Sequence, residues 1–233
     1  MFKKIYEFFR VIGELRYIIP LLKYEWPAPD DNASLAHTFE DTVNEFGDKN
    51  FIYFEDEEWT YSQTNEAANI LANKLLKEGV CHSDRVVLFM ENRPDYIISI
   101  LALNKIGAIG VLINTSLTGG PLIHCINSSE SKKCIVGAEL TPSLEGVLNE
   151  INIKEKSDIY WIKDDDNGIC PEWATNLETL LDKSQKDNLH ETNNVTAKDT
   201  AFYIFTSGTT GVPKAALFPN TKIVAASANI TKA

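Results

Sequence analysis

Basic residues are in short supply in this 233-residue chain, which has 22 lysines and arginines against 33 aspartates and glutamates, a formal net charge of −11. A general nucleic-acid-binding protein needs a basic face to neutralise phosphates, so the composition argues against that class. The simplest explanation of the acidic excess is that these acidic side chains lie on the solvent-exposed surface. Apolar residues make up 44% of the chain and charged residues 24%, which suits a globular fold with a sizeable core.

Cysteine and histidine are also scarce, with four of each. No C-x-x-C pair occurs, and the spacing of Cys81, Cys125, Cys134 and Cys170 matches no zinc pattern. We therefore expect reduced, buried cysteines in a cytosol-facing domain, and no metal site. His124 lies beside Cys125, but one neighbouring pair of this kind is far more often a packing feature than a set of metal ligands.

The N-terminal residues lack an uninterrupted hydrophobic run, because Glu14 and Arg16 break it. This excludes the core of a signal peptide and a membrane-spanning helix. Within residues 1–24, apolar residues recur at helical spacing and basic residues outnumber acidic ones. Our hypothesis is an interfacial helix on an anionic membrane surface, and a helix docked on its own domain is the alternative. Residues 1–27 thus form a basic amphipathic segment with a linker, and residues 28–233 form a separate domain.

From residue 35 onward, helical and strand patterns alternate. The predicted strands are 51–54, 59–61, 85–90, 108–113, 134–136, 159–162 and 201–205. The predicted helices are 35–46, one capped by Thr60 or Ser62 and ending near Lys77, 94–106, one from Pro121, 143–151, 177–183 and 222–233. This alternation predicts an α/β fold, a mostly parallel sheet flanked by helices on both faces. In such sheets, ligands bind beyond the carboxyl ends of the strands.

A stretch rich in glycine and hydroxyl groups follows the last predicted strand and reads Thr206-Ser207-Gly208-Thr209-Thr210-Gly211-Val212-Pro213-Lys214. Its glycines permit positive φ and close backbone approach, while its hydroxyls, backbone N–H groups and lysine suit a phosphate. The Walker A pattern is excluded because two residues separate the last glycine from the lysine, and G-x-G-x-x-G is absent. A plain surface turn is the alternative, but the lysine and the preceding strand favour a phosphate-cradling loop.

The string TSGTTGVPK resembles the signature loop of the acyl-adenylate-forming (AMP-binding) enzymes, and 59–69, 84–94 and 101–108 also resemble that family. Residues 112–125 look like the fatty acid transport protein and very-long-chain acyl-CoA synthetase branch. The resemblance covers roughly residues 28–233. It implies the N-terminal part of an AMP-binding, acyl-CoA synthetase-like domain.

The resemblance also implies a two-step reaction. A fatty acid carboxylate attacks the α-phosphate of ATP to give acyl-AMP and pyrophosphate, and the thiol of CoA then displaces AMP. The loop would hold the β- and γ-phosphates, with Mg²⁺, while charge builds on the leaving pyrophosphate. The residues expected to make these contacts are Thr206, Ser207, Gly208, Thr209, Thr210, Gly211 and Lys214.

Two features depart from the family pattern. Asn220 stands where the family often has histidine, which we expect to affect packing more than chemistry. The chain stops at Ala233, whereas the family continues for hundreds of residues, so we expect an incomplete domain whose catalytic residues lie further on. Such a fragment is expected to be inactive alone.

Two other interpretations stay open. One is an adenylating ligase for another carboxylic acid, and the other is a non-enzymatic, truncated, membrane-associated relative. In either case the basic amphipathic N-terminus suggests a cytosol-facing membrane surface, that of the endoplasmic reticulum, the peroxisome or the plasma membrane.

Overall fold

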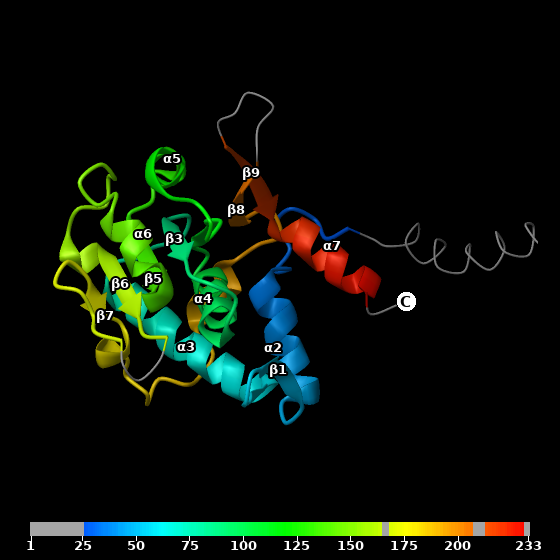
Figure 1. The fold of residues 1–233 in the computed structure, drawn as a ribbon. Coiled ribbons are helices and arrows are strands. Elements are labelled where there is room, and N and C mark those ends of the chain that lie inside the picture. Colours follow the sequence, from blue (N-terminus) through cyan, green and yellow to red (C-terminus); the bar gives the residue numbers. More distant parts are fainter. Residues whose placement is uncertain (1–25, 165–167, 207–212, 231–233) are drawn as a thin grey trace, which may run out of the picture.

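A seven-stranded sheet forms the centre of the molecule, with strand order β7-β6-β5-β3-β4-β8-β9 (Figure 1). The computed structural model describes residues 26–164, 168–206 and 213–230. Neighbouring strands run parallel except for the edge strand β9, which is antiparallel to β8. The strands are β3 (Arg85–Phe89), β4 (Ile109–Leu112), β5 (Lys133–Gly137), β6 (Ile159–Ile162), β7 (Thr175–Asn176), β8 (Thr200–Thr206) and β9 (Lys214–Pro219). The predicted mostly parallel α/β fold is confirmed.

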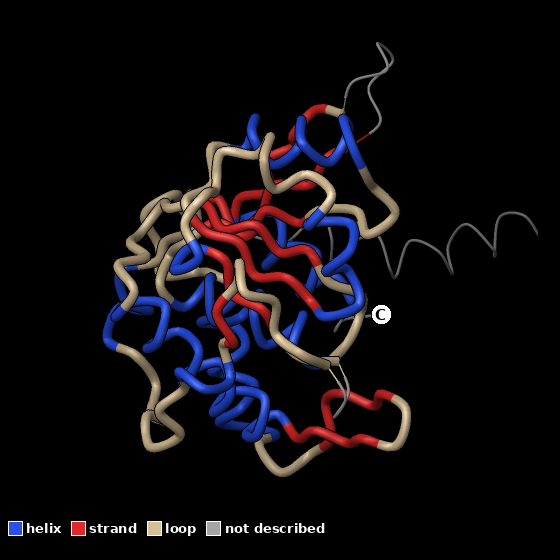
Figure 2. Tube along the Cα trace, turned by 60° about the vertical axis from the view of Figure 1, so that its left-hand side comes forward, coloured by secondary structure: helices blue, strands red, loops and turns tan. Residues whose placement is uncertain are grey.

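Two helical layers cover the two faces of this sheet, as Figure 2 shows. Alternate residues of a strand point to opposite faces, so Val86 and Leu88 join one buried cluster while Val87 and Phe89 join the other. The first cluster includes buried residues of α2 (Leu35–Phe46), α3 (Tyr61–Lys77) and α4 (Pro94–Lys105). The second includes residues of α5 (Gly119–Ser129) and α6 (Thr141–Glu145).

A separate antiparallel hairpin, β1 (Asn50–Phe54) and β2 (Glu57–Thr60), stands apart from the large sheet (Figure 2). It is attached by an aromatic cluster in which the ring of Phe51 lies 5.0 Å from that of Phe39 and 4.7 Å from that of Tyr61. Thr60 then caps α3, because its side chain accepts from the backbone N–H of Gln63 while the Gln63 side chain accepts from that of Thr60. The sequence alone allows either Thr60 or Ser62 as the cap, and the structure selects Thr60.

The last described helix, α7 (Asn220–Ile230), begins at a buried polar junction. Asn220 Oδ1 accepts from the Leu35 backbone N–H (3.1 Å) and from Asn104 Nδ2 (3.0 Å). Asn104 Oδ1 in turn accepts from the Ala36 backbone N–H at 2.8 Å. These bonds join the beginnings of α2 and α7 to α4, so the residue that departs from the family pattern has a packing role.

Two predicted helices are wrong in extent. In place of helix 143–151 the chain forms α6 over Thr141–Glu145 and then turns, although Leu144, Val147 and Ile151 are buried at helix-like spacing. In place of helix 177–183 there is a 3₁₀ turn at Glu178–Leu180. Spacing alone therefore could not separate a helix from successive turns over the same core. The strands β7 and β9 were not predicted.

All four cysteines are free, as expected, but their burial differs. Cys125 and Cys134 are buried, and burial raises the pKa of these thiols to about 11 and about 12 respectively. Cys170 is half-buried, and Cys81 is exposed, which corrects the expectation that all are buried. Among the described residues, no helix combines the length and the hydrophobicity needed to cross a membrane.

Candidate functional site

The two ends of the glycine-rich loop are held together by the β8–β9 hairpin (Figure 1). Thr206 is the last residue of β8 and pairs with Lys214, the first residue of β9. The Thr206 hydroxyl donates to the Lys214 carbonyl oxygen at 3.5 Å, and both side chains are exposed. Because β8 runs parallel to β4, the connection leaves from the carboxyl edge of the sheet, where α/β proteins bind ligands.

Helix α5 contacts the far end of this connection. His124 Nε2 lies 3.0 Å from the carbonyl oxygen of Pro213, so the imidazole donates a hydrogen bond to the residue just before Lys214. The sequence alone predicts that His124 is a packing residue. A contact between positions 89 residues apart leaves no signal in local periodicity, which is why the sequence did not reveal it.

The predicted phosphate-contacting residues fall into two groups. Thr206 and Lys214 lie at the carboxyl edge of the sheet, on paired strands. The other five predicted contacts lie outside the described residues; they are Ser207, Gly208, Thr209, Thr210 and Gly211. The hairpin therefore fixes where the loop begins and ends.

A buried arginine joins the carboxyl ends of three neighbouring strands. The side chain of Arg93, which follows β3, is 5% exposed. Its Nη1 atom lies 3.2 Å from Glu139 after β5 and 2.7 Å from Asp164 after β6, and Nε lies 3.3 Å from Asp95. Nη2 donates to the Lys163 carbonyl at 2.9 Å. A guanidinium with several directed donors suits this role, whereas a lysine would supply one point charge.

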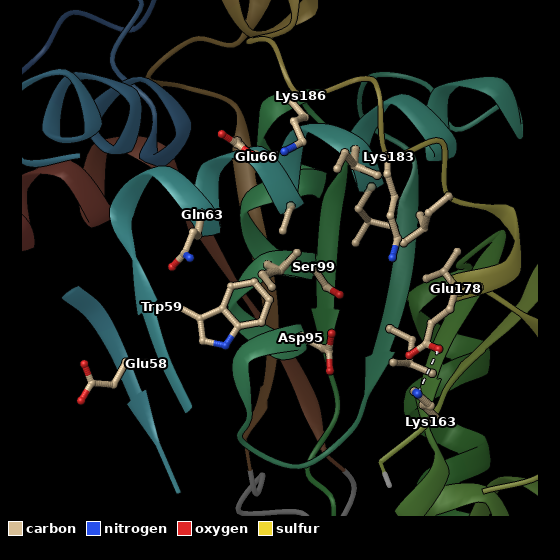
Figure 3. Close-up of a pocket in the computed structure, with 17 residues that line it drawn as sticks. Glu58, Trp59, Gln63, Glu66, Asp95, Ser99, Lys163, Glu178, Lys183 and Lys186 are labelled. Atoms are coloured by element: carbon tan, nitrogen blue, oxygen red, sulfur yellow. Dashed lines mark ion pairs between the residues drawn. The ribbon is translucent and has the colours of Figure 1, made fainter. Parts of the chain in front are cut away.

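A separate cavity of about 620 Å³ opens between α3, α4 and the segment that follows β7 (Figure 3). Its walls include Trp59, Ser99 and Leu181. No residue of β8 or β9 lines it, so it is distinct from the hairpin. The loop between β8 and β9 remains the candidate phosphate-binding site, because its sequence combines glycines, hydroxyl groups and a lysine. No glycine lines the cavity.

The part of the chain that the structure describes contains no group of three or more histidine, cysteine, aspartate or glutamate side chains arranged to hold a metal ion. Mg²⁺ at nucleotide sites usually keeps several waters and binds through substrate phosphates together with one or two carboxylates, so such a site does not require a cluster of three side chains.

A mostly parallel sheet with helices on both faces, whose glycine-rich segment connects β8 to β9 at the carboxyl edge, defines an α/β ligand-binding domain. The particular family follows from comparison with known proteins, since residues 39–232 match the AMP-binding enzyme family. The chain belongs to this family of AMP-binding enzymes.

Individual relatives are similar over most of this chain. Long-chain fatty acid transport protein 6 of Mus musculus is 31% identical over 185 residues, which are 78% of this chain and 29% of that protein. Medium/long-chain-fatty-acid–CoA ligase FadD6 of Mycobacterium tuberculosis is 31% identical over 189 residues, which are 81% of this chain and 30% of that protein. The chain thus spans about 30% of the length of these curated relatives.

Solved structures share the fold. The anthranilate CoA ligase AuaEII, in complex with anthranoyl-AMP, superposes with a TM-score of 0.72 at 22% identity, covering 84% of this chain and 36% of that one. A long-chain-fatty-acid–CoA ligase, FadD1 of Archaeoglobus fulgidus, gives a TM-score of 0.70 at 22% identity, covering 91% and 42% respectively. At this identity the likeness establishes the fold alone.

Proposed function

We propose that this chain is the ATP-phosphate-binding part of an acid–thiol ligase that converts long- or very-long-chain fatty acids into CoA thioesters. The observation that carries the proposal is the β8–β9 hairpin, which holds both ends of the TSGTTGVPK loop at the carboxyl edge of the sheet. Family membership supports the use of ATP. The names of the relatives, a fatty acid transport protein and a fatty acid–CoA ligase, support a fatty acid as the substrate.

In the proposed first step, a carboxylate oxygen bonds to the α-phosphorus of ATP and the bond to the β-phosphate oxygen breaks. Negative charge then accumulates on the departing pyrophosphate. Lys214 would place a positive charge beside it, and the Thr206 hydroxyl would turn away from the Lys214 carbonyl to donate to the pyrophosphate. His124 would hold the peptide before Lys214 through its bond to the Pro213 carbonyl. In the second step the sulfur of CoA bonds to the acyl carbon, the bond from that carbon to the AMP oxygen breaks, and AMP leaves.

Replacing Lys214 with alanine tests the proposed phosphate contact. Lys214 is exposed, so the variant should fold normally, and we expect its affinity for ATP to fall about tenfold or more, the loss of one charge-assisted contact. Calorimetric titration of the 233-residue chain measures this. Lys222→Ala is the matched control, because Lys222 is an exposed lysine on α7. Equal ATP affinities of the parent chain and Lys214→Ala would refute the assignment.

Thioester formation is proposed for a protein of the relatives' length. The matched relatives are more than three times as long as the region that this chain covers, so the 233 residues assayed alone should form no acyl-CoA. Acyl-CoA produced from ATP, CoA and a fatty acid by the purified chain would contradict this part of the proposal.

Residues 1–24 supply peripheral membrane contact in this proposal, on a cytosol-facing surface. Their basic amphipathic pattern supports it, while their structure lies outside the described residues. We expect the chain to float with anionic liposomes in a density gradient, and the chain without residues 1–24 to stay at the bottom. A helix docked on its own domain predicts instead that the deletion leaves flotation unchanged.

A further inference from the structure

The cavity beside α4 has at its wall a carboxylate that is only partly countered. Asp95, in the first turn of α4, lines the cavity (Figure 3). Its Oδ2 atom lies 3.3 Å from Arg93 Nε, but the same guanidinium also lies 3.2 Å from Glu139 and 2.7 Å from Asp164. One cation is thus shared among three carboxylates, which leaves net negative charge at this wall.

The electrostatic surroundings of Asp95 agree with this shortage of positive charge. Burial raises the pKa of the Asp95 carboxyl, Arg93 opposes this change, and the carboxylates of Glu178 and Glu57 raise the pKa further. Among the described groups that shift this pKa, Arg93 is the one cation. A second cation beside Asp95 would therefore stabilise its ionised form.

The three lysines of the wall do not reverse this balance, because four carboxylates line the cavity with them. Lys186 lies 2.7 Å from Glu66, and Lys163 lies 3.8 Å from Glu178. Lys183 is exposed to solvent. The charge at the wall therefore favours a cationic ligand over an anionic one.

An aromatic ring and apolar side chains complete the site. Trp59 lines the cavity, and its Nε1 donates to Glu57 at 2.9 Å, the same carboxylate that acts on Asp95. Figure 3 shows the indole ring beside Asp95, and the face of an indole ring attracts cations. The volume of about 620 Å³ falls in the range of pockets that hold small organic ligands. The other half-buried apolar side chains of the wall are Ala67, Ile70 and Leu181.

We propose that this cavity binds an amphipathic primary amine in its ammonium form, with the ammonium group between the Asp95 carboxylate and the Trp59 ring. The apolar body lies against Ala67, Ile70 and Leu181. Such a ligand supplies the missing positive charge and covers the apolar part of the wall. No residue of β8 or β9 lines the cavity, so the site is separate from the hairpin and does not depend on the proposed ligase function.

Calorimetric titration of the 233-residue chain with decylammonium tests the proposal, in about 0.15 M salt to screen the exposed charges of this acidic protein. We expect saturable binding of one decylammonium per chain, with decanol and decanoate binding about tenfold or more weakly. Asp95→Asn should weaken decylammonium binding about tenfold, since it removes one charge-assisted contact. Glu150→Gln is the matched control, because Glu150 is an exposed carboxylate outside the cavity, and it should bind like the parent chain.

Further variants locate the ligand. Trp59→Leu should weaken binding about threefold, the loss of one cation–π contact. Ala67→Met, which fills space at the wall and keeps a good helix former on α3, should abolish binding. Lys183→Gln should bind decylammonium as tightly as the parent chain or more tightly, because it removes a like charge. Lys214→Ala should bind like the parent chain, so failure of the ligase proposal would leave this result untouched.

Two results would overturn the proposal. One is decanoate binding to the parent chain as tightly as decylammonium, which is measured without any variant and so does not depend on a variant folding. The other is unchanged decylammonium binding in both Asp95→Asn and Ala67→Met, which would place the amine elsewhere on the acidic surface.

Discussion

Replacing Arg93 with alanine should lower the free energy of unfolding by about 3–5 kcal/mol. The arginine is buried and lies within 3.3 Å of three carboxylates, those of Asp95, Glu139 and Asp164. Removal of the guanidinium leaves these like charges close together without a cation. It also removes the hydrogen bond from Arg93 Nη2 to the Lys163 carbonyl, just after β6. Urea unfolding followed by circular dichroism measures the loss.

Two variants separate this effect from ordinary charge removal. Arg85→Ala removes an arginine whose partner Glu130 is 73% exposed, and a pair of this kind contributes about 1 kcal/mol or less. Arg93→Lys keeps a positive charge but loses the directed donors, so its stability should fall between those of Arg93→Ala and the parent. If Arg93→Ala cost no more than Arg85→Ala, Arg93 would not hold the strand ends together.

Replacing Gly107 with alanine should cost about 2–3 kcal/mol, the second largest effect expected. Gly107 follows α4 with φ +67°, a conformation that is strained for any residue with a Cβ atom. The added Cβ would also overlap the His82 ring and lie 2.8 Å from its Nε2 atom. To make room, the ring would have to move from its contact with Asp199 at 3.2 Å.

Gly79 provides a matched control for Gly107. It follows α3 in the same way, with φ +80°, and a Cβ atom at this position would have nothing within 4 Å. Gly79→Ala should therefore cost only the backbone strain, about 1 kcal/mol. The comparison by thermal or urea unfolding isolates the contact with His82. Equal losses in the two variants would show that this contact contributes nothing.

The sequence predicted the central sheet well because its strands are short apolar runs between helices. The bounds of β6 were predicted to the residue, and β3, β4 and β5 within a few residues. Buried parallel strands cannot alternate polar and apolar residues, so they stand out from amphipathic helices. The edge strand β9 was missed because it begins at Lys214, a residue that the sequence assigned to the phosphate-cradling loop.

The candidate site was only partly predictable. Residue types and spacing indicated the loop, and its place after a strand, but the return of the chain as β9 depends on pairing with β8. The contact of His124 with Pro213 and the cluster around Arg93 join residues far apart in the sequence. Such contacts depend on how complete helices and strands pack against one another. The local pattern of a single sequence does not show this packing.

The most direct test of the phosphate-binding claim is a map of where ATP binds on the ¹⁵N-labelled 233-residue chain, by chemical-shift perturbation. We predict that the largest changes fall at Thr206, Lys214 and His124. Pyrophosphate should perturb the same residues, whereas AMP, which lacks the β- and γ-phosphates, should perturb them much less. Changes centred on the cavity around Ser99, or equal changes with AMP and ATP at the hairpin, would contradict the account.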